Sequence, residues 1–210
     1  MIRHHPTLET LLAHAAGTLA DGPAVVVEAH AQGCPQCRAT LDALDATGGQ
    51  LLGELSPAPL EPATFERVLA RLDVSPAVRP PPPRQASLAL PQGTRLPAAL
   101  RNAQIGRWFW VAPGVRYSRV RLPWAPAQNL MLLRVGGGRR VPHHSHGGME
   151  LTQVLWGGFR DGDDRYGPGD LGEADETTAH QPLADPEGCI CLASLEGGLR
   201  LPWLTRLLGK

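Results

Sequence analysis

Three side chains that bind metals well fall within eight residues of one another near the start of the chain. His30 is followed by Cys34 and Cys37 in the pattern H-x3-C-x2-C. An imidazole and two thiols on one side of a tight turn suit a tetrahedral zinc ion. The alternative is a redox pair, or incidental buried thiols with His30 on a helix surface. A C-x2-C pair in a chain that is not secreted more often binds metal or undergoes redox chemistry than stays inert, so we favour a metal site.

A tetrahedral site needs a fourth ligand, and two candidates precede the first predicted helix. His4 and His5 are adjacent, and either could fold back to close the site. The pattern of residues does not by itself choose between them.

A second group of candidate ligands lies in the other half of the chain. His144 and His146 are two residues apart, so on a strand their side chains point to the same face. A glycine turn can return Glu150 to that face, and His180 is the natural fourth ligand after one more strand. His143 is one position out of phase and is expected to point away. The group therefore predicts a metal site inside a barrel.

Four short helices are predicted to position the first group. They begin at Thr7, at Asp21, at Pro35 and after Pro62, where capping residues or prolines precede apolar residues at helical spacing. The pair Gly48-Gly49 weakens the third helix. A core made of these helices is small, so a bound metal would contribute much of the folding free energy, and leftover apolar faces could belong to a partner.

A proline-rich stretch separates the two halves. Residues 74–88 contain five prolines, four of them consecutive at 80–83. Such a stretch cannot continue a helix and is typical of an extended, semi-rigid spacer. It predicts an interdomain linker.

Beyond the linker the pattern changes to short strands separated by Gly, Pro and Asp clusters, which is typical of an antiparallel barrel or jelly roll. The predicted strands are 108–111, 115–120, 129–135, 151–155 and 189–194. We expect the tryptophans of this half to fill the barrel or its mouth. These are Trp108, Trp110, Trp124 and Trp156.

The balance of charged residues argues against some kinds of binding partner. Lys plus Arg and Asp plus Glu each total 20 in 210 residues, so no net positive charge favours DNA or an anionic membrane as a partner. A protein or a small ligand fits better. The sequence shows neither a secretion signal nor an apolar run that could span a membrane, so a cytoplasmic location with reduced cysteines is expected.

These motifs carry a resemblance to a known family. The spacing G-x5-H-x-H-x3-E-x6-G from Gly138 to Gly157, with Gly169-Asp170 and His180 behind it, resembles the cupin metal-binding motif. The paired histidines followed by H-x3-C-x2-C resemble the zinc-binding anti-sigma domain. The two in this order, joined by a linker, resemble the ChrR-type zinc-dependent anti-sigma factors over almost the whole chain.

The resemblance implies a multi-domain α and β protein. Residues 1–75 would form a small helical zinc-binding anti-sigma domain, 76–88 a linker, and 89–210 an antiparallel β-barrel of the cupin or jelly-roll type. It also implies that the helical domain sequesters an extracytoplasmic-function sigma factor, and that the cupin-like domain releases it under singlet oxygen or organic peroxide. The metal ligands carried over by motif position, with His5 preferred to His4, are His5, His30, Cys34 and Cys37 in the first domain and His144, His146, Glu150 and His180 in the second.

Two function classes remain to be weighed. On the regulator interpretation, four protein ligands leave the first zinc no open position, and it stabilises a binding surface without chemistry. On the alternative interpretation, the second site belongs to a metal-dependent cupin oxygenase or isomerase, since its ligand set accepts Zn, Mn, Fe or Ni. No general base is evident beyond the ligands, so we favour the regulator. Cys189 and Cys191 share one face of a strand, either as core residues or as a redox-sensing pair.

Overall fold

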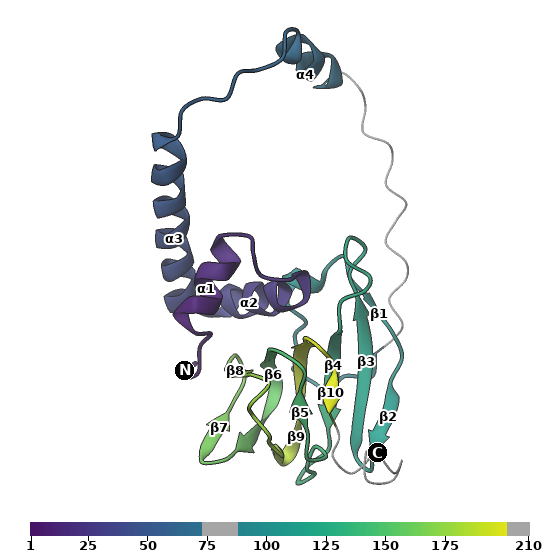
Figure 1. Cartoon of the computed structure of the whole chain (residues 1–210). Helices are drawn as coiled ribbons and strands as arrows, with labels where there is room; N and C mark the ends of the chain where they lie inside the picture. Colours follow the sequence, from purple (N-terminus) through teal and green to yellow (C-terminus); the bar gives the residue numbers. More distant parts are fainter. Residues whose placement is uncertain (73–87, 201–210) are drawn as a thin grey trace.

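Helices and strands occupy different halves of the chain. The computed structural model describes residues 1–72 and 88–200 (Figure 1). The predicted linker at 76–88 lies outside the described residues, apart from Leu88, and the predicted domain boundaries stay predictions. Four helices confirm the predicted N-terminal half; they are α1 (Leu8–Ala15), α2 (Asp21–Gly33), α3 (Pro35–Glu54) and α4 (Thr64–Leu72). A short 3-10 helix, η1 (Ala98–Leu100), precedes the strands of the second half.

Local chemistry explains where the helices begin and end. The Thr7 hydroxyl accepts a hydrogen bond from the Thr10 N–H at 3.2 Å and so caps α1. Gly17 follows α1 with a φ of +67°, a conformation that favours glycine. Pro35 occupies the first turn of α3, where its missing N–H costs nothing. The Gly48-Gly49 pair lies within α3 without interrupting it.

The second half forms one curled antiparallel sheet and one small two-stranded sheet. The large sheet has the order β1-β3-β4-β9-β6-β7, with β2 paired to β3 and β8 paired to β6, and β5 pairs with β10. This half-barrel confirms the predicted cupin-type architecture. The strands are β1 (Gln104–Ile105), β2 (Phe109–Ala112), β3 (Val115–Arg121), β4 (Leu130–Val135), β5 (Ser145–His146), β6 (Glu150–Asp161), β7 (Asp164–Tyr166), β8 (Leu171–Ala174), β9 (Leu183–Leu195) and β10 (Leu199–Arg200).

Helix α2 packs directly on the sheet. It contacts both β6 and β9, and Figure 1 shows it lying across that end of the sheet. Val26 and Val27 are fully buried in the same apolar cluster as Leu132 and Leu192. A Cβ on Gly22 would lie 2.5 Å from the Ser194 hydroxyl, so glycine permits the close approach. The helical and strand-forming halves therefore share one core.

The end of α3 and all of α4 stand apart from this core. Figure 1 shows α3 rising away from the sheet and α4 lying well beyond it. Helix α4 buries no residue. No helix within residues 1–72 and 88–200 is both long and apolar enough to cross a membrane. The large apolar side chains exposed on this outer segment, from 51 to 72, are Leu51, Leu52, Leu55, Leu60, Phe65, Val68, Leu69 and Leu72.

Two of the four tryptophans contradict the expectation that they fill the barrel. Trp110 is 64% exposed and Trp124 is 55% exposed. The Arg116 guanidinium covers the Trp110 ring at 3.9 Å, and the Trp124 indole N–H donates to Asp21 at 3.1 Å. The prediction was wrong for these two because cationic and carboxylate partners stabilise an aromatic ring outside a core. Trp108 does pack against the core.

Candidate metal centres

The predicted His/Cys ligands converge at the base of the helical segment. His5 precedes α1, His30 is in the last turn of α2, and Cys34 and Cys37 begin α3. One potential ligand atom from each lies within 4.8 Å of the others. We call this group the first centre. His4 does not join it, since its ring packs on Tyr166 with centroids 4.2 Å apart.

The geometry of the first centre fits a tetrahedral ion. The Cys34 and Cys37 sulfurs each lie 3.4 Å from Nδ1 of His5. Ligands at the usual zinc distances of about 2.0–2.3 Å lie roughly 3.3–3.8 Å apart around a tetrahedron. Nε2 of His30 is buried and has no hydrogen-bond partner among the described residues, although an imidazole nitrogen without a partner is costly to bury. A metal ion would satisfy it.

The protonation states in the first centre couple metal binding to proton release. Burial lowers the pKa of His30, which keeps the imidazole neutral and able to bind a metal. Burial and the neighbouring Cys34 thiol raise the pKa of Cys37 to about 12 in the metal-free protein. The thiols must therefore lose protons when a metal binds, as thiolate ligands do. Neither cysteine is in a disulfide.

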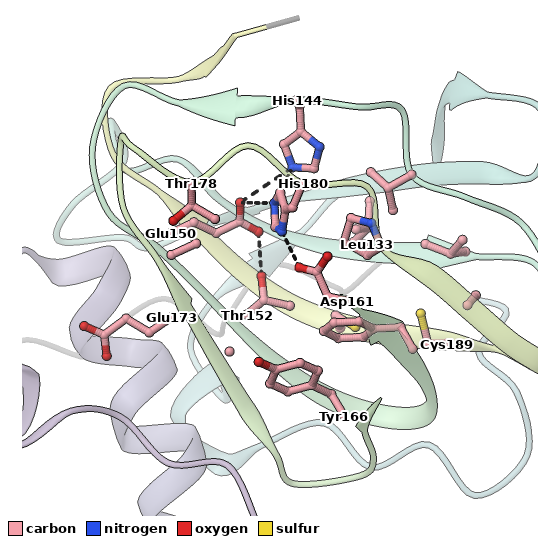
Figure 2. Close-up of a pocket in the computed structure, with 18 residues that line it drawn as sticks. Leu133, His144, Glu150, Thr152, Asp161, Tyr166, Glu173, Thr178, His180 and Cys189 are labelled. Carbon is pink, nitrogen blue, oxygen red and sulfur yellow. Dashed lines mark hydrogen bonds and ion pairs between the residues drawn. The ribbon is translucent and has the colours of Figure 1, made fainter. Parts of the chain in front are cut away.

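The second predicted group also comes together. Figure 2 shows three of its members, His144, Glu150 and His180, side by side within the half-barrel. His144 and His180 pair through an isolated bridge, His146 ends β5, and Glu150 begins β6. Nε2 of His146 is in contact with the Glu150 carboxylate, and Nε2 of His144 and of His180 lie 3.8 and 3.9 Å from it. We call this group the second centre. His143 is exposed and points away from it, as expected.

Hydrogen bonds behind the ligands orient the second centre. Nδ1 of His180 is 2.5 Å from Oδ2 of Asp161, and Nδ1 of His144 donates to the Pro142 carbonyl at 2.8 Å. The Thr152 hydroxyl donates to Glu150 at 2.8 Å. These contacts leave Nε2 of both histidines directed at the glutamate, as metal ligation requires. Asp161 and Thr152 were not predicted from the sequence. Asp161 ends β6 beside an Asp-rich turn, and only the folded sheet brings it to His180.

The charges of the second centre suit a cation. Burial acts to raise the pKa of Glu150, but its interactions with the His144 and His146 imidazoles outweigh burial and hold the pKa well below the usual range. The hydrogen bond to Glu150 raises the pKa of His146 despite burial. A buried carboxylate anion thus faces three imidazoles. A divalent metal bound between them would neutralise the carboxylate and replace the direct contact between Nε2 of His146 and Glu150.

A cavity of about 200 Å³ adjoins the second centre. His144, Glu150 and His180 line one part of it, and most of the remaining wall is apolar. Cys189 and Cys191 are both buried and both line the cavity. The pKa of Cys191 is raised mainly by its hydrogen bond with Cys189 and also by burial, so its thiol stays protonated. The two thiols are core residues that also border the second centre. Both interpretations of the pair, as core residues and as a redox-sensing pair, therefore remain open.

Comparisons with known proteins agree on one family. A family model described as the ChrR Cupin-like domain matches residues 98–197. The chain is 41% identical over 205 residues to the Anti-sigma-E factor ChrR of Cereibacter sphaeroides, an alignment that covers 95% of this chain and 92% of that protein. The crystal structure of Rhodobacter sphaeroides SigE in complex with the anti-sigma ChrR is similar with a TM-score of 0.76 and 35% identity. That match covers 93% of this chain and 100% of the matched chain.

Proposed function

The chain belongs to the ChrR-type family of anti-sigma factors, and we propose from this that it binds an extracytoplasmic-function sigma factor and releases it under oxidative stress. In this proposal the helices make the inhibitory surface, and the second centre responds to singlet oxygen or organic peroxide. The protein acts in the cytoplasm, where sigma factors meet RNA polymerase. It binds neither nucleic acid nor a membrane itself.

The observation that supports sigma-factor binding is the apolar outer segment of α3 and α4. In α4, Phe65, Val68, Leu69 and Leu72 follow the spacing i, i+3, i+4, i+7, and all are exposed. An amphipathic helix with this spacing is suited to lie in an apolar groove of a partner protein. Since no residue within 1–72 or 88–200 covers this apolar face, it is typical of an interaction site. The ChrR chain that was solved in complex with SigE matches 93% of this chain. This match supports a sigma factor as the partner that covers the outer segment.

In the first centre we propose a structural zinc ion. His5, His30, Cys34 and Cys37 supply four ligands, so the ion keeps no open position for water or substrate. Since Cys34 and Cys37 begin α3, the ion fixes the base of the helix that carries the first part of the outer segment. The zinc would therefore hold the inhibitory surface in place and do no chemistry.

In the second centre we propose that His144, His146, Glu150 and His180 hold a metal ion, zinc or else Mn, Fe or Ni. The adjoining cavity leaves room for a small oxidant or ligand beside these residues. Oxidation or ligand binding at the second centre can release the sigma factor only if it changes the balance between a binding and a releasing state of the whole protein. Shared packing between α2 and the sheet supplies a physical connection for this.

The proposal is tested by transcription in a purified system. The full-length chain is added to core RNA polymerase and a candidate sigma factor from the same genome. We expect stoichiometric inhibition, co-elution of the two proteins, and recovery of transcription after singlet oxygen is generated. Inhibition that persists after exposure would leave the anti-sigma role intact and contradict the stress-release role.

An enzymatic second centre is the other candidate function, and the cavity beside the ligands is the observation that favours it. An open metal position next to an apolar pocket is also what a metal-dependent oxygenase or isomerase needs. Oxygen consumption or turnover of a small molecule by the metal-loaded chain, in the absence of sigma factor, would support this alternative. A regulator should bind without turnover.

A further inference from the structure

The turn before β8 reaches across to the first centre and contacts one ligand directly. The Gly169 carbonyl lies 2.9 Å from Nδ1 of His30. A metal-bound imidazole donates its second ring N–H to an outer acceptor, which sets the tautomer and the ring orientation. Here that acceptor comes from a residue 139 positions away, in the other half of the chain. With Nδ1 donating to Gly169, Nε2 of His30 is left for the metal.

The same turn also holds the backbone just before His5, the other histidine of the first centre. Oδ1 of Asp170 accepts hydrogen bonds from the N–H groups of Arg3 at 2.6 Å and of His4 at 3.1 Å. The Leu171 N–H donates to the His4 carbonyl at 3.1 Å. These three bonds fix the backbone of Arg3 and His4, immediately before His5. Without them, residues 1–6 would be an extended segment outside any helix or strand, with nothing of their own structure to aim His5.

The turn itself is built to make this contact. Oδ2 of Asp170 accepts from the Gly167 N–H at 2.8 Å, so one carboxylate oxygen closes the turn while the other binds the N-terminal segment. Asp170 is only 4% exposed. Gly169 has a φ of +91°, and a Cβ there would lie 2.8 Å from the Ile2 side chain. A larger residue at 169 would be strained at this positive φ and would force the Ile2 side chain to move.

We propose that Gly169 and Asp170 are positioning residues of the first centre, supplied by the cupin-like domain as its outer shell. The inference rests on the proposed metal at the first centre but not on the sigma factor. The centre in the full chain then binds its metal more tightly than its four ligands alone would achieve. The strand that follows extends the contact, since Glu173 of β8 accepts hydrogen bonds from the Thr7 N–H at 3.0 Å and the Thr10 hydroxyl at 2.8 Å.

Strand β8 also connects the first centre to the second. Ala174 pairs with Glu150 across the ladder of β8 and β6. Glu173 and Ala174 line the cavity beside the second centre. One four-residue strand therefore borders the second centre, while its preceding turn orients the first. A shift of β8 would alter the positions of His5 and His30, which gives the two centres a physical route for mutual influence.

The test measures metal binding by the purified full-length chain without any sigma factor. Cobalt replaces zinc, because thiolate-to-cobalt charge-transfer absorption reports the cysteine-containing first centre and is silent for the second. Zinc release to a chromogenic chelator gives the dissociation rate. For Asp170→Ala we expect a charge-transfer spectrum of altered shape and zinc release about 10- to 100-fold faster, the usual effect of losing an outer-shell partner.

Matched variants separate positioning from general damage. Asp170→Asn keeps one oxygen that can accept from Arg3 and His4 but loses the acceptor for the Gly167 N–H, so its cobalt spectrum should lie between those of Asp170→Ala and the wild type. Asp175→Ala removes an exposed carboxylate just after β8, whose hydrogen bonds go to Thr177 and Thr178, and should leave the first centre unchanged. Retention of the second metal shows that the sheet is folded. If Asp170→Ala does not fold, Arg3→Pro removes one donor N–H without altering the sheet and should also speed zinc release.

The outcomes are distinguishable. A folded Asp170→Ala or Arg3→Pro protein with the wild-type cobalt spectrum and zinc release rate would overturn the positioning role. If the wild-type chain binds no metal at the cysteines, the proposed structural zinc is wrong, and the inference that depends on it fails with it. Loss of sigma-factor inhibition with normal metal binding would instead contradict the proposed function and leave the positioning role standing.

Discussion

The two candidate centres differ in both their ligands and their surroundings. The first centre has two histidines and two cysteines, all from residues 5–37, and its ligands enclose the position of the ion. The second centre has three histidines and a glutamate on the sheet, and it borders a cavity of about 200 Å³. A closed thiolate site suits a structural ion, whereas a site with free space beside it suits a ligand or an oxidant. This contrast supports our proposal that the first centre stabilises the fold and that the second responds to a signal.

The largest effect should come from breaking the first centre. Cys34→Ser removes one thiolate, and structural zinc sites contribute about 10–16 kcal/mol of apparent binding free energy at neutral pH. We expect the variant to lose the first metal, part of its helical circular dichroism and all inhibition of the sigma factor. Metal analysis, circular dichroism and the transcription assay measure these together. Cys189→Ser is the matched control, since it alters a cysteine outside the first centre and should keep the first metal.

Breaking the second centre should have a different result. Glu150→Ala removes the one anionic ligand, so this variant should lose the second metal while still inhibiting the sigma factor. Stress-induced release should disappear. Reporter output before and after singlet oxygen, with metal content of each protein, provides the measurement. His143→Ala, which alters the exposed neighbouring histidine, should behave as wild type. Normal release by a folded, metal-free Glu150→Ala protein would show that the second metal is not the sensor.

Substitutions in the outer segment should weaken binding of the sigma factor and change the stability of the fold little. Phe65→Ala combined with Leu72→Ala removes two exposed apolar side chains from α4. If the sigma factor buries both, the loss is about 3 kcal/mol or more, which weakens binding at least roughly 100-fold. Calorimetry or interferometry with the purified sigma factor measures it. Trp110→Ala, at a similarly exposed aromatic residue on β2, should leave the affinity unchanged.

The smallest effect tests whether the two halves fold as one unit. Val26→Ala removes buried methyl groups where α2 meets the sheet, and we expect a loss of about 2 kcal/mol in the free energy of unfolding. The helical and aromatic circular dichroism signals should shift together in denaturant. Val68→Ala on the exposed face of α4 should change stability by less than about 0.5 kcal/mol. Two separate transitions in the wild-type protein would argue against a shared core.

Sequence reasoning predicted what depends on local spacing. Helix starts at Thr7 and Pro35 follow from capping and proline chemistry, and strands β3 and β4 and the second half of β9 follow from apolar patterning. The ligand groups were also predicted, because metal ligands at fixed spacing are few. Whether they bind metal stays a prediction.

The features that were missed all depend on packing between distant segments. The contact of α2 with the sheet, the Asp161–His180 pair and the Asp170 turn join residues that lie far apart in the chain. Strands β1, β5 and β10 have two residues each, too few to show an alternating pattern. Trp110 and Trp124 were placed wrongly because hydrophobicity alone does not reveal a charged partner.

The hydrogen bonds that Asp170 accepts from Arg3 and His4 can form only late in translation. They join residues 166 and 167 positions apart, so the outer shell of the first centre does not exist until the ribosome has made most of the chain. At about 5–20 residues per second, His5 waits roughly 8–33 s for that turn. During this interval the nascent helical segment carries its zinc ligands and its apolar outer segment without the sheet. A sigma factor encountered before the sheet is complete would therefore meet an immature inhibitor, and full inhibition should lag behind translation of the N-terminal half.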